Sequence, residues 1–195
     1  ANDVATVVAE NMAGTEIKFA KLMTKKAKTI GMRRTSFRNA SGLPNRGQVS
    51  TARDMVQLAI AIKRDFPEFY RYFKTKKFRY RGRTFRNHNM LLGRYTGTDG
   101  IKTGYTNASG YNLVASVKRN GRHLIGVVFG GKSGKRRDRH MVRLLDKSFV
   151  TAIRLAKNKP PKPMTNPKYR IAAIVKNPLN LGNKKENWGI QVGAY

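Results

Sequence analysis

Three consecutive residues near the middle of the chain, Lys102, Thr103 and Gly104, have the properties that a carboxylate-binding strand needs. The pattern from residue 100 to residue 106 predicts a strand around them. A lysine on a strand edge supplies a fixed positive charge, and a threonine hydroxyl adds a hydrogen bond to the same carboxylate. Glycine leaves room for a substrate backbone to lie against the strand. The trio therefore predicts a site for a molecule that ends in a carboxylate.

Besides this trio, the sequence offers little for nucleophilic or metal chemistry. It has no cysteine, which excludes thiolate nucleophiles, disulfides and thiolate zinc sites. The three histidines, His88, His123 and His140, are scattered, so we expect no histidine-based metal site. No serine is followed three residues later by a lysine, the spacing of a serine nucleophile and a lysine base. Thr15 does precede Lys18 at this spacing, but on a lysine-coated helix face, which favours a surface pair.

The charge of the chain is its most unusual property, with 41 Lys and Arg against 10 Asp and Glu and a formal net charge of +31. Such a balance favours a polyanionic partner or an anionic surface, but it does not indicate a fold. The cations are spread from Lys18 to Lys185, and no signature of a nucleic-acid-binding domain is present. We therefore expect no specific nucleic acid. An anionic polymer and a peripheral association with a membrane remain as interpretations of the charge.

The elements that must position the trio follow from the spacing of apolar residues. A helical period predicts helices over residues 4–12, 17–30 and 55–62, and another from about 137 to 157. Thr51 and Asp54 resemble a capping box at the start of the third helix.

The middle of the chain changes to a strand period. Residues 77–85 alternate basic and aromatic side chains around a glycine, which predicts a hairpin. Residues 100–106, 111–118 and 123–129 predict three further strands, the last two joined by a turn at Asn120-Gly121. Helices, then an antiparallel sheet, then a helix indicate the α+β class.

The composition and periodicity of the sequence change after Ala156. Residues 157–187 are basic, contain several prolines and have little periodicity, which predicts an extended linker. Residues 188–195 are β-like, with no partner strand after them. The sequence therefore predicts a domain over residues 1–156, a linker, and a short C-terminal segment.

Five segments in a fixed order carry a resemblance to a known family. They are Asn39-Ala-Ser-Gly-Leu-Pro, Ser50-Thr-Ala-Arg-Asp-Met, Asn87-His-Asn-Met-Leu-Leu, Thr98-Asp-Gly-Ile-Lys-Thr-Gly-Tyr-Thr and Ala108-Ser-Gly-Tyr-Asn-Leu-Val-Ala-Ser. Over about residues 1–155 the chain resembles the D-alanyl-D-alanine carboxypeptidases, the low-molecular-mass penicillin-binding proteins of the serine peptidase class. The resemblance implies a β-lactamase- or transpeptidase-like fold, an antiparallel sheet flanked by helices. This chain would be a partial domain that lacks the N-terminal part.

The resemblance also implies an activity, the trimming of peptidoglycan stem peptides that end in D-Ala-D-Ala through an acyl-serine intermediate. β-Lactams would be ligands because they mimic the dipeptide. In this family the motifs S-x-x-K, S-x-N and K-T-G meet in one cleft. By the resemblance, Lys102 and Thr103 would hold the terminal carboxylate and take part in catalysis, and Gly104 would line the substrate site. The backbone N–H of Tyr105 would share the oxyanion hole with the nucleophilic serine.

Three more residues receive roles by the same resemblance. Asn2 matches the asparagine of S-x-N and would be a catalytic residue that contacts substrate and the general-base lysine. Arg137 matches an arginine near the carboxylate site, with a plain surface arginine as the alternative. His88 lies where a polar residue lines the cleft in relatives, although a loop-surface histidine is the favoured interpretation. Since S-x-x-K is missing from the chain, we expect the nucleophile upstream and no activity of this chain alone.

Residues 188–195 resemble the first strand of SPOR domains, which bind peptidoglycan glycan strands; a frayed strand is the alternative interpretation. Two other functions remain open from the residues. One is a non-catalytic basic module that binds peptidoglycan or the envelope, and the other is a nucleic-acid-binding protein, argued from charge alone. Stem peptides lie outside the cytoplasmic membrane, so the resemblance implies a periplasmic protein, although this chain contains no signal peptide.

Overall fold

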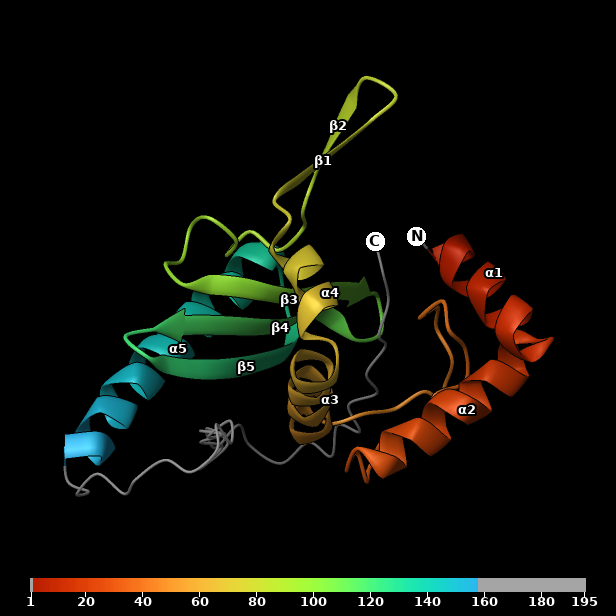
Figure 1. Cartoon of the computed structure of the whole chain (residues 1–195), viewed down its shortest axis with the longest axis horizontal. Coiled ribbons are helices and arrows are strands. Elements are labelled where there is room, and N and C mark those ends of the chain that lie inside the picture. Colours follow the sequence, from red (N-terminus) through yellow and green to blue (C-terminus); the bar gives the residue numbers. More distant parts are fainter. Residues whose placement is uncertain (1, 158–195) are drawn as a thin grey trace.

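A three-stranded antiparallel sheet between two helices forms the centre of the molecule (Figure 1). The computed structural model describes residues 2–157, so the residues from 158 onward, which include the SPOR-like segment and nearly all of the predicted linker, lie outside the described residues. The sheet consists of β3 (Thr98–Thr106), β4 (Gly110–Arg119) and β5 (Arg122–Gly131), in that order. Helix α3 (Ala52–Asp65) packs on one face and α5 (Gly134–Lys157) on the other. The predicted α+β architecture is confirmed.

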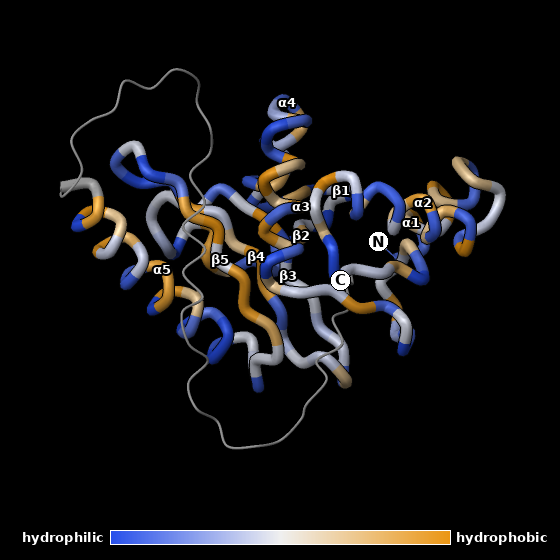
Figure 2. The backbone as a smooth tube through the Cα atoms, turned by 90° about the horizontal axis from the view of Figure 1, so that it is seen from below, coloured by the Kyte–Doolittle hydropathy of each residue, from blue (hydrophilic) through white to orange (hydrophobic). Residues whose placement is uncertain are grey.

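Strand β4, the middle strand, is buried on both faces because α3 and α5 pack on opposite faces of the sheet. Leu113, Ala115 and Val117 pack in a cluster with α5, whereas Val114 packs in the cluster with α3. This is why the strand reads as a continuous apolar run rather than an alternating one, as the hydropathy colouring of Figure 2 also shows.

The turn between β4 and β5 has the geometry that the sequence predicts. Asn120 has φ 47° and Gly121 has φ 72°, so both central residues are left-handed, as a two-residue type I′ turn requires. The turn sets the pairing register, in which Arg119 lies opposite Arg122 and Val117 opposite Leu124. A shift of one residue would exchange the side chains that face α3 with those that face α5, so this register determines which side chains pack against which helix.

The predicted helices are present, with small differences at their ends. The first third forms α1 (Asn2–Ala13) and α2 (Glu16–Thr29). A one-turn helix α4 (Pro67–Tyr70) and a 3₁₀ helix η1 (Arg71–Lys74) follow α3. Helix α5 begins earlier than predicted because Ser133 accepts hydrogen bonds from the N–H groups of Arg136 and Arg137 and thereby caps its first turn.

The predicted capping box at α3 is half correct. Thr51 caps the helix, because its hydroxyl accepts the Asp54 N–H at 3.1 Å. The Asp54 carboxylate, however, does not reach back to Thr51. It accepts the Arg34 N–H at 2.8 Å and the Thr35 hydroxyl at 2.6 Å, and so fastens the preceding loop to the buried side of the helix.

Among residues 2–157, no helix is long and apolar enough to cross a membrane.

The predicted hairpin forms β1 (Lys77–Tyr80) and β2 (Arg83–Arg86), which pair only with each other in the described part of the chain. Figure 1 shows it as an arm that projects from the body above β3. The same figure shows α1 and α2 on the side of the molecule away from α5.

Candidate functional site

Strand β3 carries the predicted carboxylate-binding trio at an edge of the sheet. Within the described residues it pairs with β4 alone, so its other edge faces no further strand. Lys102 lies opposite Val114 and Thr103 opposite Leu113. The two side chains therefore leave opposite faces of the strand, one toward the α3 side and one toward the α5 side. An edge of this kind can accept an extended peptide by backbone pairing.

The ammonium group of Lys102 is half-buried, and its Nζ donates to the backbone carbonyl of Thr103 at 2.6 Å. The ion pairs among residues 2–157 involve other cations, so no described carboxylate neutralises it. Burial lowers the pKa of Lys102 below its usual value, because desolvation disfavours the charged form. A partly desolvated cation without an anion is suited to receive the carboxylate of a ligand.

Thr103 and Gly104 continue the strand beside this ammonium. Both are buried, and the Thr103 hydroxyl makes no hydrogen bond to another described residue. A buried hydroxyl without a protein partner is uncommon, because burial removes its bonds to water. Lys102 thus keeps an ammonium without a described carboxylate, and Thr103, whose side chain leaves the opposite face of β3, keeps a hydroxyl without a described hydrogen-bond partner.

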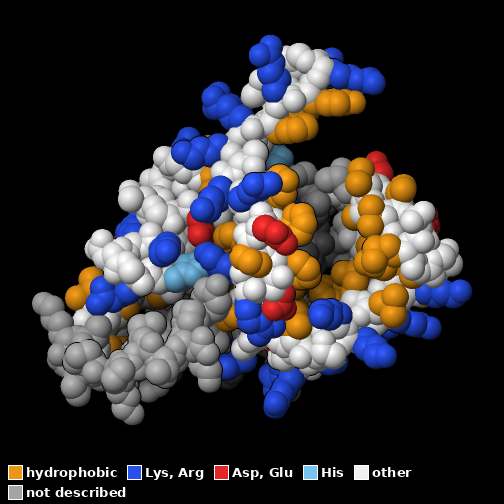
Figure 3. Space-filling view, viewed as in Figure 1, with side chains coloured by type: hydrophobic (Ala, Val, Ile, Leu, Met, Phe, Trp, Pro, Cys, Tyr) orange, Lys and Arg blue, Asp and Glu red, His pale blue; other side chains and the backbone are white. Residues whose placement is uncertain are grey.

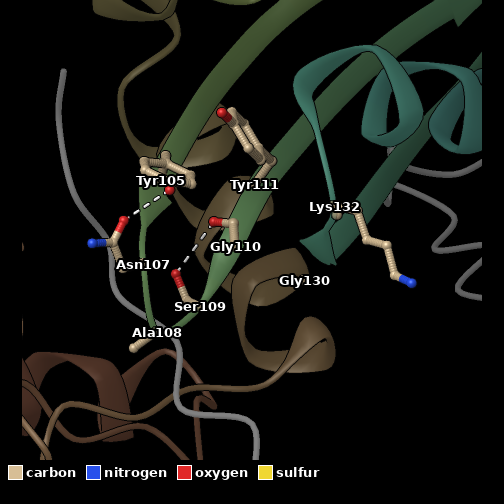
Figure 4. A pocket seen from close by; sticks show the side chains of 9 residues that line it. Tyr105, Asn107, Ala108, Ser109, Gly110, Tyr111, Gly130 and Lys132 are labelled. Carbon is tan, nitrogen blue, oxygen red and sulfur yellow. Dashed lines mark hydrogen bonds between the residues drawn. The ribbon is translucent and has the colours of Figure 1, made fainter.

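A pocket of about 390 Å³ opens where β3 and β4 meet (Figure 4). Tyr105 lies on its wall, where its ring contacts the ring of Tyr111 with centroids 4.3 Å apart and its hydroxyl donates to Asn107 at 2.8 Å. The rest of the wall comes from the β3–β4 turn and from the end of β5. The pocket thus adjoins the end of the trio without including Lys102 or Thr103.

Arg137 lies in the first turn of α5, where its side chain is only 5% exposed. Its guanidinium donates to Asp138 at 2.7 and 3.0 Å and to the backbone carbonyl of Asn112 at 3.3 Å. Asn112 is the cross-strand partner of Gly104. In this geometry Arg137 fastens the strand next to the trio and presents no open guanidinium.

The structure does not bring Asn2 and His88 into this group of residues. Asn2 is the first residue of α1, which packs against α2, and no hydrogen bond joins it to β3 among the described residues. His88 is exposed in the segment after β2, which fits the surface interpretation. Of the predicted site residues, the trio and Tyr105 therefore lie together on one strand, β3.

A buried polar cluster at the other end of β3 was not predicted. The Asp99 carboxylate pairs with the Lys63 ammonium at 2.7 Å and accepts the Ser116 hydroxyl at 2.5 Å. His123 Nε2 lies 2.6 Å from the Ser116 hydroxyl and 3.0 Å from Lys63 Nζ. Desolvation, with the nearby charge of Lys63, lowers the pKa of His123 to about 4. The Ser116 side chain is fully buried, so this serine, histidine and aspartate are structural rather than a nucleophilic site.

Comparison with known proteins decides the family. The family model described as D-alanyl-D-alanine carboxypeptidase matches residues 1–133, about two thirds of the chain and all of β3, β4 and β5. The chain belongs to the D-alanyl-D-alanine carboxypeptidase family. The resemblance that the sequence motifs carry is thereby confirmed at the level of the family, whereas no SPOR domain is supported.

Individual relatives agree with this assignment. The chain is 37% identical to D-alanyl-D-alanine carboxypeptidase DacF of Bacillus subtilis over 157 residues, and 37% identical to DacA of Escherichia coli over 149 residues. Each match covers 76% of this chain but only 39% and 37% of the relative. The chain therefore spans less than two fifths of the length of these curated relatives.

Solved structures confirm the fold. Penicillin binding protein 5 of Haemophilus influenzae superposes with a TM-score of 0.72 at 36% identity, over 76% of this chain and 44% of that protein. Penicillin-binding protein D2 of Listeria monocytogenes, solved in an ampicillin-bound form, superposes with a TM-score of 0.69 at 31% identity. This match covers 75% of this chain and 61% of the Listeria protein. The α+β sheet with its flanking helices is thus a partial carboxypeptidase-family domain.

Proposed function

We propose that this family member contributes one wall of the substrate cleft of a serine-type D-Ala-D-Ala carboxypeptidase. The observation that carries the proposal is the half-buried Lys102 ammonium, which lacks an acidic partner among residues 2–157 and lies on a strand edge that pairs with no other described strand. The next residue, Thr103, has a hydroxyl without a described hydrogen-bond partner. A peptide that ends in D-Ala-D-Ala provides an extended backbone for this edge and a terminal carboxylate for these two groups.

The proposed reaction is acyl transfer in two steps. A serine Oγ attacks the carbonyl carbon of the penultimate D-Ala, the peptide bond breaks, and the terminal D-Ala leaves with a proton on its nitrogen. Water then hydrolyses the acyl-serine ester, which returns the serine and releases the shortened peptide. Lys102 and Thr103 hold the carboxylate of the leaving D-Ala. The N–H of Tyr105 contributes to the oxyanion hole, next to the buried Gly104.

The remaining parts of this proposed site come from outside the trio. The nucleophile and its lysine base lie outside these 195 residues, because the chain contains no S-x-x-K motif. Asn2 matches the asparagine of S-x-N by sequence alone, because in the described structure it begins α1, away from β3; its proposed role is to contact the base lysine and the substrate in the complete site. Arg137 acts by positioning Asn112 and, through it, the strand that pairs with Gly104. No metal or cofactor takes part in the proposed reaction.

The proposed setting of the reaction is the cell envelope. The support for this setting is that the similar proteins include bacterial D-alanyl-D-alanine carboxypeptidases and penicillin-binding proteins. Peptidoglycan stem peptides are the proposed substrate and β-lactams the proposed inhibitors. The protein would encounter both in the periplasm, which is its proposed location. The net charge of +31 favours a second candidate, a non-catalytic basic module that binds peptidoglycan without cleaving it.

Intact-mass spectrometry after incubation with benzylpenicillin tests the proposal. The chain as it stands is run beside a longer version that carries an S-x-x-K segment before residue 1, and beside the longer version with Lys102→Met. We expect the longer protein to gain one penicillin mass, the Lys102→Met version to be labelled at least about tenfold more slowly, and the short chain to gain none. If the longer protein is folded but unlabelled, the non-catalytic module replaces the enzyme.

A further inference from the structure

The arm formed by β1 and β2 stands apart from the rest of the described structure. All eight residues of the two strands are exposed, and the strands pair only with each other within residues 2–157. Three of these residues are aromatic, with exposed fractions of 61% for Phe78, 55% for Tyr80 and 53% for Phe85. Figure 3 shows the arm protruding, with hydrophobic and basic side chains at its surface. Three exposed aromatic side chains on a two-stranded arm are costly in water, which points to a partner.

The pairing register sorts the side chains of the arm onto two faces. Phe78 lies opposite Phe85, and Tyr80 opposite Arg83, so the three aromatic side chains share one face with a single strand cation, Arg83. The rings of Phe78 and Tyr80 are nearly parallel, with centroids 6.4 Å apart. The other face is cationic, with these side chains: Lys77, Arg79 and Arg86, beside Thr84. The arm is thus amphipathic across its thickness.

The tip of the arm adds an unusual cation. Arg81 has φ 45° and Gly82 has φ 74°, so both form the centre of a type I′ turn. Asn or Gly is preferred at the first of these positions, because a larger side chain is strained in the left-handed region. The guanidinium of Arg81 lies over the ring of Tyr80 at 5.4 Å, which joins the tip cation to the aromatic face.

The stretch of sequence that contains the arm carries only positive charge. Between Glu68 and Asp99 the sequence has no acidic residue and nine cations: Arg71, Lys74, Lys76, Lys77, Arg79, Arg81, Arg83, Arg86 and Arg94. An aromatic face with basic residues on the opposite face and at the tip is the pattern of segments that lie in the interface of an anionic membrane. There, aromatic rings lie at the depth of the headgroups, and Lys and Arg side chains reach the lipid phosphates.

We propose that the β1–β2 arm docks this protein on the surface of an anionic phospholipid bilayer. A single-stranded nucleic acid would need rings for its bases and cations for its phosphates on the same side of the arm. The register instead places most of the strand cations behind the rings, which suits insertion of one face into an interface. This surface is distinct from the Lys102 strand edge, so the proposal does not depend on the proposed catalytic function.

Vesicle co-sedimentation of the full chain tests the proposal, with vesicles of phosphatidylcholine containing 30 mol% phosphatidylglycerol as the probe. The first variant, Phe78→Ser with Tyr80→Ser and Phe85→Ser, keeps the net charge. We expect it to bind at least about tenfold more weakly. Because these side chains lie outside the two hydrophobic cores, its thermal unfolding should match that of the parent chain.

Two matched charge variants separate the arm from the general charge of the protein. Arg79→Gln, Arg81→Gln and Arg83→Gln change the arm, whereas Lys18→Gln, Lys21→Gln and Lys25→Gln change the exposed face of α2. Each set removes three charges, and we expect the arm set to weaken vesicle binding several times more than the α2 set. Equal losses in both sets, or parent-like binding by the aromatic variant, overturn the proposal.

A fluorescence measurement locates the contact directly. In the variant Phe78→Trp, we expect the added emission to shift to shorter wavelength and to become protected from iodide when vesicles are present. Unchanged emission with bound vesicles overturns the proposal. Loss of single-stranded DNA binding in the aromatic variant, with vesicle binding intact, assigns the arm to a nucleic acid and likewise overturns it.

Discussion

At the scale of single residues, two half-buried lysines show the difference between a structural cation and one kept for a ligand. Lys63 is paired with Asp99 at 2.7 Å, whereas Lys102 donates only to a backbone carbonyl. Burial lowers the pKa of both ammonium groups, but only the ammonium of Lys63 has a carboxylate that counteracts this effect. The fold thus tolerates an uncompensated charge at Lys102, as expected where binding rather than stability determines the residue.

This difference predicts opposite effects on stability. Lys102→Met should raise the free energy of unfolding by about 1 kcal/mol, because an apolar side chain of similar length replaces an unpaired, partly desolvated cation. Lys63→Met should lower it by about 1–2 kcal/mol, because it leaves the half-buried Asp99 without its cation. Urea unfolding of both variants at pH 7 measures this. A stability loss in Lys102→Met as large as that in Lys63→Met contradicts the assignment of Lys102 as a ligand cation.

His123 makes the stability depend on pH. Its pKa is lowered to about 4 in the folded chain from 6.5, chiefly by desolvation and then by the charge of Lys63. The unfolded chain therefore binds a proton at a higher pH than the folded chain, and the free energy of unfolding falls as the pH drops from about 6.5 to about 4. In His123→Gln this part of the fall should disappear. Urea unfolding at pH 7 and pH 5 measures this change. If the free energy of unfolding falls by the same amount between these pH values in the variant and in the parent chain, His123 is not the group responsible.

The sequence predicted the residues of the trio but not their surroundings. Lys102, Thr103 and Gly104 are neighbours in the chain, so their shared strand edge follows from a local pattern. Lys63, Asp99 and His123 come from α3, β3 and β5, and only the packing of the helix on the sheet brings them together. The burial of Arg137 is likewise tertiary, since nothing in its basic neighbourhood distinguishes it from the exposed Arg136 and Arg139.

At the scale of elements, turn chemistry was the most reliable guide. The Asn120-Gly121 turn and the α3 cap at Thr51 formed where the sequence predicted them, because both depend on residues adjacent in the chain. Two features were not predicted: the hydrogen-bond partners of the Asp54 carboxylate and the first residue of α5. The first depends on Thr35 and the second on Ser133, and both residues lie in neighbouring loops.

The left-handed turn gives a prediction for the β4–β5 pair. Gly121→Ala should lower the free energy of unfolding by about 1–2 kcal/mol, because alanine is strained at φ 72°. Gly134→Ala, at the first residue of α5, is the matched control. Its new Cβ would meet only Tyr111 at 3.8 Å, an ordinary contact, and should leave stability unchanged or raise it. Thermal unfolding distinguishes the two; similar losses would mean that the turn is not under conformational constraint.

At the scale of the whole molecule, the first two helices expose a broad apolar surface. Their periodicity predicted helices correctly, yet Val4, Val7 and Met12 on α1 are 64–68% exposed, and Ile17 on α2 is 67% exposed. Figure 3 shows hydrophobic side chains gathered on this part of the molecule. A surface of this kind is expected where further polypeptide packs, and the curated relatives are more than twice as long as the matched region.

This surface should bind a hydrophobic dye. We expect Val4→Ser with Val7→Ser to reduce the fluorescence of 8-anilinonaphthalene-1-sulfonate by about half, without lowering the melting temperature. Val150→Ser, at a valine of α5 that is also 67% exposed, is the control and should change little. Equal reductions in both variants would show that the dye binds isolated apolar residues and not a continuous surface.

The most direct test of the carboxylate site is a nuclear magnetic resonance titration of this chain with N-acetyl-D-alanyl-D-alanine. We expect saturable shifts of the backbone amides of residues 102–105 and of the Lys102 side chain. We also expect these shifts to be lost when the terminal carboxylate of the dipeptide is replaced by an amide, and when Lys102 is replaced by Met. Shifts of the same size with the amide, or no response of β3 in the folded chain, would contradict a carboxylate site at Lys102.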